Sequence, residues 1–402
     1  MPRDIPLLFS TRTIRLFAYG FLSVVLALYL TEIGLSESQV GLLLTFTLAG
    51  DAGISLWLTT RADRLGRRRM LVLGAGLMLL AGLAFLFTRN PILLTLAAII
   101  GVISPSGNEI GPFLSIEQAG LSQLVPGEKR TQTFAWYNLA GSFATASGAL
   151  AGGWLARGLQ ASGWTALESY RFVLAGYALA GLVLAICFAC SSPAVEVQQA
   201  AQHEKSRLGL HKSRRVVLKL ASLFALDAFA GGLIVQSMIA YWFHLRFGAD
   251  SGVLGSIFFG ANILAGISAL LAVKIARRFG LINTMVFTHI PSNLLLMLVP
   301  LMPNLPLAIG VLLARFSISQ MDVPTRQSYI MAVVEPDERS AASGVTSIAR
   351  SVGAALSPSL AGIFLGIPAL LSLSFFLSGG LKIIYDLSLW RAFRQVKPPE
   401  EQ

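Results

Sequence analysis

The segment TTRADRLGRR, residues 59–68, joins two apolar stretches, 38–60 and 70–88, that are each long enough to cross a lipid bilayer. The segment is strongly basic, and Gly66 near its end permits a tight turn. Residues 70–88, by contrast, contain no charged side chain. A short basic loop between two such stretches predicts a pair of membrane-spanning helices.

The composition extends this interpretation to the whole chain. Of the 402 residues, 54% are hydrophobic and 13% are charged, and the mean hydropathy is +0.69. Soluble globular proteins carry about 25% charged residues. A soluble fold of this length would lack the polar side chains needed to cover its surface, whereas lipid solvates apolar side chains directly.

Apolar stretches of sufficient length predict twelve spans, six on each side of a polar stretch from Glu196 to Arg215. The predicted spans are residues 12–34, 38–60, 70–88, 93–122, 132–157, 169–190, 215–243, 250–274, 281–301, 304–332, 339–364 and 368–390. We therefore expect an all-α membrane protein with a first bundle at 1–190, a linker at 191–214 and a second bundle at 215–402.

The basic residues predict the orientation. The formal net charge is +11, and most of the 31 Lys and Arg residues fall in loops on the side of the N-terminus. Because such residues favour the cytoplasm, we expect both termini and the linker to be cytoplasmic, in the inner or plasma membrane. The basic clusters have no interleaved aromatic residues, which argues against nucleic-acid binding.

The two halves repeat the same local patterns. Residues 62–66, ADRLG, recur as ARRFG at 276–280, and Glu117-Gln118 corresponds to Arg326-Gln327. Repeats at a nearly constant spacing indicate a duplicated six-helix unit.

Residues 59–68 also resemble the major facilitator superfamily pattern G-x-x-x-D-[RK]-x-G-[RK]-[RK], from which only Thr59 departs. The resemblance implies two pseudo-symmetric bundles around a central cavity lined by the first, fourth, seventh and tenth helices, in a monomer. It also implies that Asp63, Arg64, Gly66 and Arg67 belong to a cytoplasmic gate. The alternative is a basic loop that only sets the topology.

A weaker resemblance lies in the fifth span. Residues 148–153, GALAGG, are similar to the G-P-x-x-G-G pattern of proton-coupled drug antiporters, without its proline. Ordinary close packing of helices through small residues explains the same pattern.

Charged residues inside spans are costly, so each is a candidate for substrate binding or proton coupling. A carboxylate held away from water can bind and release a proton near neutral pH. Permanent neutralisation by a neighbouring cation is the alternative for each acid. The candidates are Asp51, Glu109, Asp227, Asp322 and the cation Arg350.

Prolines and glycines beside Glu109, and Pro324 beside Asp322, predict breaks in the fourth and tenth helices. Glu117 and Arg326 occupy equivalent repeat positions with opposite charge. We hypothesise that they form a salt bridge between the halves that breaks when the cytoplasmic side opens; a local role, in which each charge contacts its own loop, is the alternative.

These features predict a secondary active transporter that works by alternating access and exports a small organic solute with protons as the coupling ion. A metal-cation exporter and a facilitative uniporter are the alternatives. The chain lacks P-loop and G-x-S-x-G patterns, so we expect neither an enzyme nor an ATP-driven pump. No cofactor is expected, since Cys187 and Cys190 lack the second ligand pair of a metal site.

Overall fold

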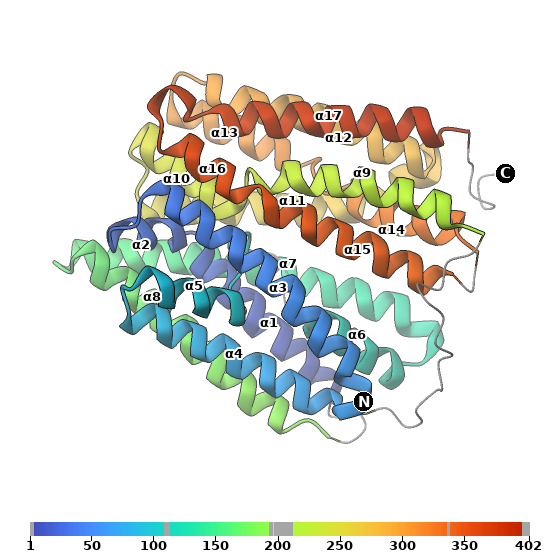
Figure 1. The fold of residues 1–402 in the computed structure, drawn as a ribbon, viewed down its shortest axis with the longest axis horizontal. Coiled ribbons are helices and arrows are strands. Elements are labelled where there is room, and N and C mark those ends of the chain that lie inside the picture. The colour runs from blue at the N-terminus through green and yellow to red at the C-terminus, as the bar shows by residue number, and fades with distance from the viewer. Residues whose placement is uncertain (1–3, 108–112, 193–195, 197–211, 336–337, 396–402) are drawn as a thin grey trace. The chain divides into compact units, whose positions relative to one another are not determined.

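The computed structural model describes residues 4–107, 113–192, 196, 212–335 and 338–395. All regular secondary structure in these ranges is helical, and Figure 1 shows the helices in chain order. In the first half the helices are α1 (Asp4–Ser23), α2 (Leu26–Glu32), α3 (Glu37–Leu65), α4 (Arg67–Phe87), α5 (Pro91–Ile100), α6 (Phe113–Leu124), α7 (Gly127–Ala161) and α8 (Ala166–Ala189).

The second half repeats this pattern of long and interrupted helices. Its helices are α9 (Arg214–Gly232), α10 (Gln236–Phe247), α11 (Ser251–Phe279), α12 (Leu281–Leu298), η2 (Val299–Leu301), α13 (Leu305–Phe316), α14 (Asp322–Val333), α15 (Arg339–Leu356), α16 (Pro358–Leu365), η3 (Pro368–Leu370) and α17 (Leu373–Phe393). Helix occupies every one of the predicted spans.

Among the described residues, 8 helices are long and apolar enough to cross a membrane, or up to 9 if the bent pair α1 and α2 is one span. The two helices of that pair meet at 45°. Some of the other predicted spans contain shorter apolar helices, α5 and α13.

The two predicted breaks are confirmed. In the fourth span α5 ends at Ile100 and α6 begins at Phe113, and Gly107 adopts a φ of 68° that other residues rarely tolerate. In the tenth span α13 ends at Phe316 and α14 begins at Asp322, with Pro324 in its first turn. Proline is tolerated there because first-turn N–H groups have no intrahelical acceptor.

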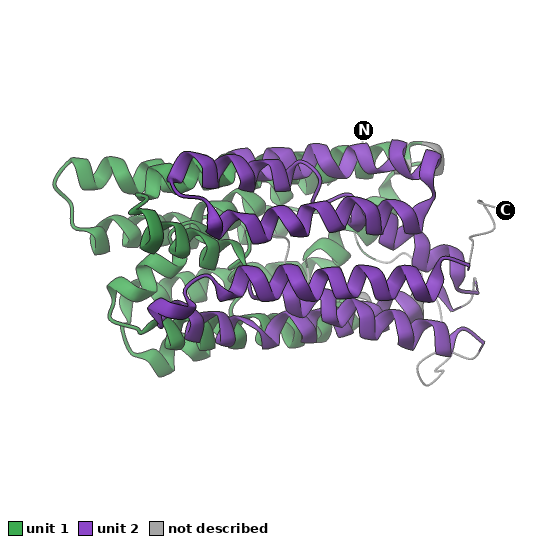
Figure 2. Cartoon of the chain, turned by 90° about the horizontal axis from the view of Figure 1, so that it is seen from above, with its two compact units in different colours: residues 1–202, 235–259 green, residues 203–234, 260–402 purple. Residues whose placement is uncertain are grey.

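The described chain divides into two compact units, drawn in different colours in Figure 2. Unit 1 comprises Met1–Gln202 together with Val235–Phe259, and unit 2 comprises His203–Ile234 and Gly260–Gln402. Unit 1 therefore includes α10 and the beginning of α11, which follow the break after α9 in the seventh predicted span.

Close helix packing in unit 1 explains the small residues of the fifth span. A Cβ atom on Gly148 would lie 2.0 Å from the Phe17 carbonyl oxygen, and one on Gly152 would lie 2.1 Å from that of Phe21. Helices α7 and α1 thus approach each other backbone to backbone at these glycines. This contact supports the packing interpretation of residues 148–153.

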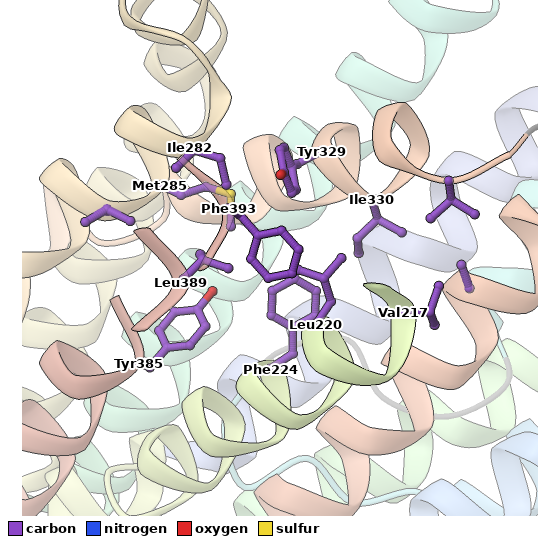
Figure 3. Packing of buried hydrophobic residues seen from close by; sticks show 13 residues of the cluster. Val217, Leu220, Phe224, Ile282, Met285, Tyr329, Ile330, Tyr385, Leu389 and Phe393 are labelled. Atoms are coloured by element: carbon purple, nitrogen blue, oxygen red, sulfur yellow. The ribbon is translucent and has the colours of Figure 1, made fainter. Parts of the chain in front are cut away.

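Unit 2 has its own hydrophobic core, built from the faces that α9, α12, α14 and α17 turn toward one another (Figure 3). Phe224 of α9 and Tyr385 of α17 pack edge to face, with ring centroids 6.3 Å apart. Tyr329 and Phe393 make a similar contact at 6.1 Å. This core holds the four helices together beside the charged residues described next.

Candidate functional site

The buried carboxylate of Asp227, on α9, lies at the centre of a charged cluster in unit 2. Three cations from three other helices contact it. Lys382 Nζ on α17 is 2.5 Å from Oδ1. Arg350 on α15 and Arg326 on α14 contact Oδ2 at 3.0 and 3.3 Å. Because the side chain is only 4% exposed, these contacts take the place of water around its negative charge.

Asp322 extends the cluster along α14. Its Oδ2 atom accepts a hydrogen bond from Arg326 Nη1 at 2.8 Å, one helical turn away. The same nitrogen contacts Asp227, so one guanidinium bridges both acids. The Arg326 guanidinium also lies over the Phe224 ring, 5.6 Å from its centroid. The structure therefore brings together three of the predicted site residues, Asp227, Asp322 and Arg350, with the predicted gate residue Arg326.

Arg350 differs from the rest of the cluster in its exposure. Its side chain is 34% exposed, whereas those of Arg326, Asp322 and Lys382 are 7%, 7% and 9% exposed. Arg350 is thus the member of the cluster that water or a solute can reach most directly.

Unit 1 contains a corresponding buried ion pair between α1 and α6. Arg15 donates to both carboxylate oxygens of Glu117, at 2.9 and 2.7 Å. Both side chains are 0% exposed. Thr11 donates a further hydrogen bond to Glu117 at 2.8 Å, as does the Tyr137 hydroxyl of α7. Such a bidentate, fully enclosed pair is geometrically specific.

Glu117 and Arg326 are each paired with helical residues of their own unit, a third arrangement beside the hypothesised bridge between the halves and the contact of each charge with its own loop. Glu117 is paired with Arg15 within unit 1, and Arg326 is paired with Asp322 and Asp227 within unit 2. The opposite charges at equivalent repeat positions therefore reflect two separate ion pairs. Sequence comparison of the repeats identified the positions but not their partners, which lie on α1, α9 and α14.

One further candidate acid belongs to unit 1. Asp51, on α3, accepts a hydrogen bond from Ser55 at 3.2 Å, one turn along the same helix. Glu109 lies outside the described residues.

In the basic loop of residues 59–68, Gly66 adopts a φ of 102° and separates α3 from α4. The Glu196 carboxylate accepts hydrogen bonds from the backbone N–H groups of Arg67 and Arg68, at 2.8 and 3.2 Å. These N–H groups begin α4 and have no intrahelical acceptor, so the linker residue caps the helix and complements its dipole. The side chains of Asp63 and Arg64 lie outside the description.

A second buried group in unit 2 joins α12 to α17. The Asp386 carboxylate lies 2.9 Å from His289 Nδ1 and accepts a hydrogen bond from Asn293 at 3.2 Å. His289 is thus held within the fold by its contact with Asp386.

Sequence analysis missed the roles of three cations. Lys382 lies inside a predicted span, and Arg12 and Arg15 fall near the start of another. Arg12 donates to Asn138 at 3.2 Å and lies over the Tyr137 ring. The three-residue spacing of Arg12 and Arg15 places them on one face of a helix. Two arginines three residues apart inside a predicted span were therefore the sequence feature that could have indicated a buried site.

Comparison with known proteins supports the same fold and identifies relatives. The family model for the Major Facilitator Superfamily matches residues 8–358. The uncharacterized membrane protein YJR124C of Saccharomyces cerevisiae is 33% identical over 421 residues, covering 96% of this chain and 93% of the relative.

Solved structures of transporters share the fold at low sequence identity. A bacterial homolog of the human lysosomal transporter Spinster superposes with a TM-score of 0.75 at 17% identity, over 97% of this chain and 96% of that one. A D-xylose-proton symporter gives 0.75 at 17%, over 96% and 97%. The nucleoside transporter NupG gives 0.76 at 14%, over 98% and 99%.

Proposed function

Because the chain belongs to the Major Facilitator Superfamily and is a multi-pass membrane transporter, we propose that it is a secondary active transporter that exports a small organic solute by alternating access, with protons as the coupling ion. The proposed coupling site in unit 2 comprises Asp322, Asp227, Arg326 and Arg350; Glu109 and Asp51, in the first half of the chain, are separate candidates for coupling. The N- and C-termini are proposed to be cytoplasmic, in the inner or plasma membrane, because the basic loops lie on their side.

The observation that carries this proposal is the arginine shared between two buried acids. Arg326 Nη1 lies 2.8 Å from Asp322 and 3.3 Å from Asp227. Protonation of Asp322 would weaken its contact with Arg326 and leave the guanidinium to Asp227, which keeps its contacts with Lys382 and Arg350. A proton can therefore change the pairing between α14 and α9 without exposing an unpaired charge to lipid.

Contacts made by α10 and the beginning of α11 support the alternating-access part of the proposal. Gln236 donates to Ser23 at 2.7 Å, and the Ser237 hydroxyl donates to the Pro105 carbonyl at 2.6 Å. These contacts join a segment from the second half of the chain to the break points of the first and fourth spans. Hydrogen bonds between neutral groups at three chain breaks are suited to forming and separating during a transport cycle.

The packing of α7 against the beginning of α11 is also suited to separating during a transport cycle. A Cβ atom on Gly153 of α7 would lie 2.2 Å from the Ser251 carbonyl oxygen and 2.8 Å from the Cα atom of Gly255. Arg157 and Asp250 form an exposed ion pair at 3.5 Å nearby in the sequence. A surface sealed by small residues and one exposed ion pair can separate at modest cost, since exposed pairs contribute little.

The test is transport in proteoliposomes with a pH-sensitive dye inside. D-xylose, uridine and a panel of organic acids would be added to the intact protein and to the Glu109→Gln and Asp322→Asn variants. Solute-driven proton flux that the neutral variants abolish is the expected result. Solute exchange without any proton flux would indicate the uniporter alternative, and solute-independent exchange of divalent cations would indicate the metal exporter.

A further inference from the structure

We propose that the solute of this transporter is an anion, and that its carboxylate, phosphate or sulfonate group binds Arg350 on the exposed polar face of α15. The inference deepens the proposed function and rests on it for the statement that the bound anion is carried across the membrane. The binding site itself is argued from unit 2 alone.

The charges of the cluster do not balance. Three cations, Lys382, Arg350 and Arg326, surround two carboxylates, Asp227 and Asp322. Both arginines contact the same oxygen, Oδ2 of Asp227. The cluster therefore carries one positive charge in excess, and a bound anion would neutralise it in surroundings where a net charge is costly.

Burial decides which cation receives the anion. Lys382 and Arg326 are at least nine-tenths buried, but the Arg350 side chain is 34% exposed. A guanidinium has five N–H donors, and Nη1 of Arg350 makes the ion pair with Asp227. The exposed part of the group can present further donors to an oxyanion in the planar, two-bond geometry that arginine favours.

The surface beside Arg350 is polar, although α15 lies in a predicted membrane span. Ser343, Ser347 and Ser351 recur at four-residue intervals near Arg350 and are all exposed. On the adjoining part of the same exposed surface Ile348, Val352 and Leu356 are 48%, 53% and 58% exposed. Because lipid solvates the apolar face and not hydroxyl groups, the serine face is the hydrated one. Its hydroxyls supply neutral hydrogen-bond donors around the cationic group.

This arrangement selects against cationic and metal solutes. A cation approaching Arg350 would meet a positive group first, and the two carboxylates behind it are already paired. Repulsion at close range in a partly dehydrated site is larger than in water. Because the exposed group of the cluster is a cation and the carboxylates are buried, the site favours a negatively charged solute.

The test measures the local potential without needing the natural solute. Ser347 is replaced by Cys in a Cys187→Ser, Cys190→Ser background, and labelling rates are compared for a sulfonate-bearing and a trimethylammonium-bearing methanethiosulfonate. We expect Arg350→Gln to reduce the ratio of anionic to cationic labelling rates about tenfold, and Arg350→Lys to retain most of the ratio.

The matched control is Arg339→Gln, which removes the same charge from the first turn of the same helix. Arg339 lies about 12 Å along the helix from the labelled position 347, beyond the screening length of about 8 Å at 0.15 M salt, so the ratio should change little. An equal fall in Arg339→Gln and Arg350→Gln, or no fall in either, would overturn the proposal.

Occupancy is measured with methyl methanethiosulfonate, an uncharged reagent whose approach the local potential neither favours nor opposes. Benzoate should slow the labelling of Ser347→Cys at least threefold, and benzylammonium at the same ionic strength should not. Protection by benzylammonium, or by neither compound, would contradict the anion site. These measurements involve no transport, so a failure of proton-coupled flux in the proteoliposome assay would count against the proposed function alone.

Discussion

The buried ion pairs of the two units use corresponding helices with the charges exchanged. In unit 1 the cation Arg15 lies on the first helix and the acid Glu117 on the second part of the fourth span. In unit 2 the acid Asp227 lies on the seventh span and the cation Arg326 on the second part of the tenth. The duplication thus retains a buried pair between the same two helices of each unit, whichever helix carries the acid.

The two pairs differ in how completely they are enclosed. Glu117 is 0% exposed and accepts hydrogen bonds from Arg15, Thr11 and Tyr137. In unit 2 one arginine is shared between two acids, and Arg350 reaches the surface. A fully satisfied pair has one stable arrangement, whereas a shared arginine has at least two. We infer that the pair in unit 1 stabilises the packing of its helices and that the cluster in unit 2 couples solute transport to protons.

The largest effect on stability is expected from a substitution in the enclosed ion pair of Arg15 and Glu117. Glu117→Ala should lower the free energy of unfolding by about 3–5 kcal/mol, because Arg15 would stay buried without its counter-charge. The measurement is thermal unfolding of the purified protein in detergent. The double variant Arg15→Met, Glu117→Leu should be more stable than Glu117→Ala; if it is equally unstable, the loss does not come from the unpaired arginine.

Next in size is the close contact between α7 and α1. Gly148→Ala should cost about 1–3 kcal/mol, because the new Cβ would lie 2.0 Å from the Phe17 carbonyl oxygen. Gly158→Ala is the control on the same helix, since no atom lies within 4 Å of a Cβ there. That control should gain about 0.5–1 kcal/mol from its better helix propensity. Equal unfolding temperatures for both variants would show that unit 1 is not packed rigidly at Gly148.

The cluster in unit 2 should respond in transport more than in stability. Asp322→Asn should slow solute-driven proton flux at least about tenfold, because the shared arginine would lose one of its two partners. Arg326 keeps Asp227 in this variant, so the free energy of unfolding should fall by less than that of Glu117→Ala. If Asp322→Asn unfolds as readily as Glu117→Ala and transports normally, the assignment of roles to the two units is reversed.

The smallest effect is expected from removing the Tyr137 hydroxyl, which donates a hydrogen bond to Glu117. Tyr137→Phe removes one hydrogen bond to Glu117 and leaves the Arg15 contacts in place. The loss should be about 1 kcal/mol in unfolding and none in transport rate. Comparison of initial transport rates per folded molecule tests this separation. A clear change in transport would indicate that unit 1 also takes part in coupling.

Sequence periodicity was sufficient for most of the fold because helices in lipid must satisfy their own backbone and present apolar side chains. The ranges 38–60 and 70–88 therefore predicted α3 and α4 to within a few residues, apart from the polar end of α3. The helix breaks near Pro105 and Asp322 were predictable because proline and glycine disrupt a helix at their own position in the chain. The long α7 was predicted at 132–157 and extends further at its polar ends, where hydropathy carries no signal.

The site was less predictable because it depends on partners far apart in the chain. Charges inside spans identified Asp227, Asp322, Arg326 and Arg350 as candidates, and the structure brings all four together. It did not follow from the sequence that Glu117 pairs with Arg15 rather than with Arg326. A buried charge requires a counter-charge, but sequence alone does not say which of several cations lies close enough.

The sequence by itself determined that this chain spans a membrane as a duplicated helical unit, since hydropathy and repeat patterns are local properties that each segment carries. Only the tertiary structure decided how the charges are shared. Helix packing set Arg15 against Glu117 in an enclosed site and left Arg350 exposed beside Asp227. The cost of burying a charge depends on distances between helices, and those distances exist only after the helices have packed.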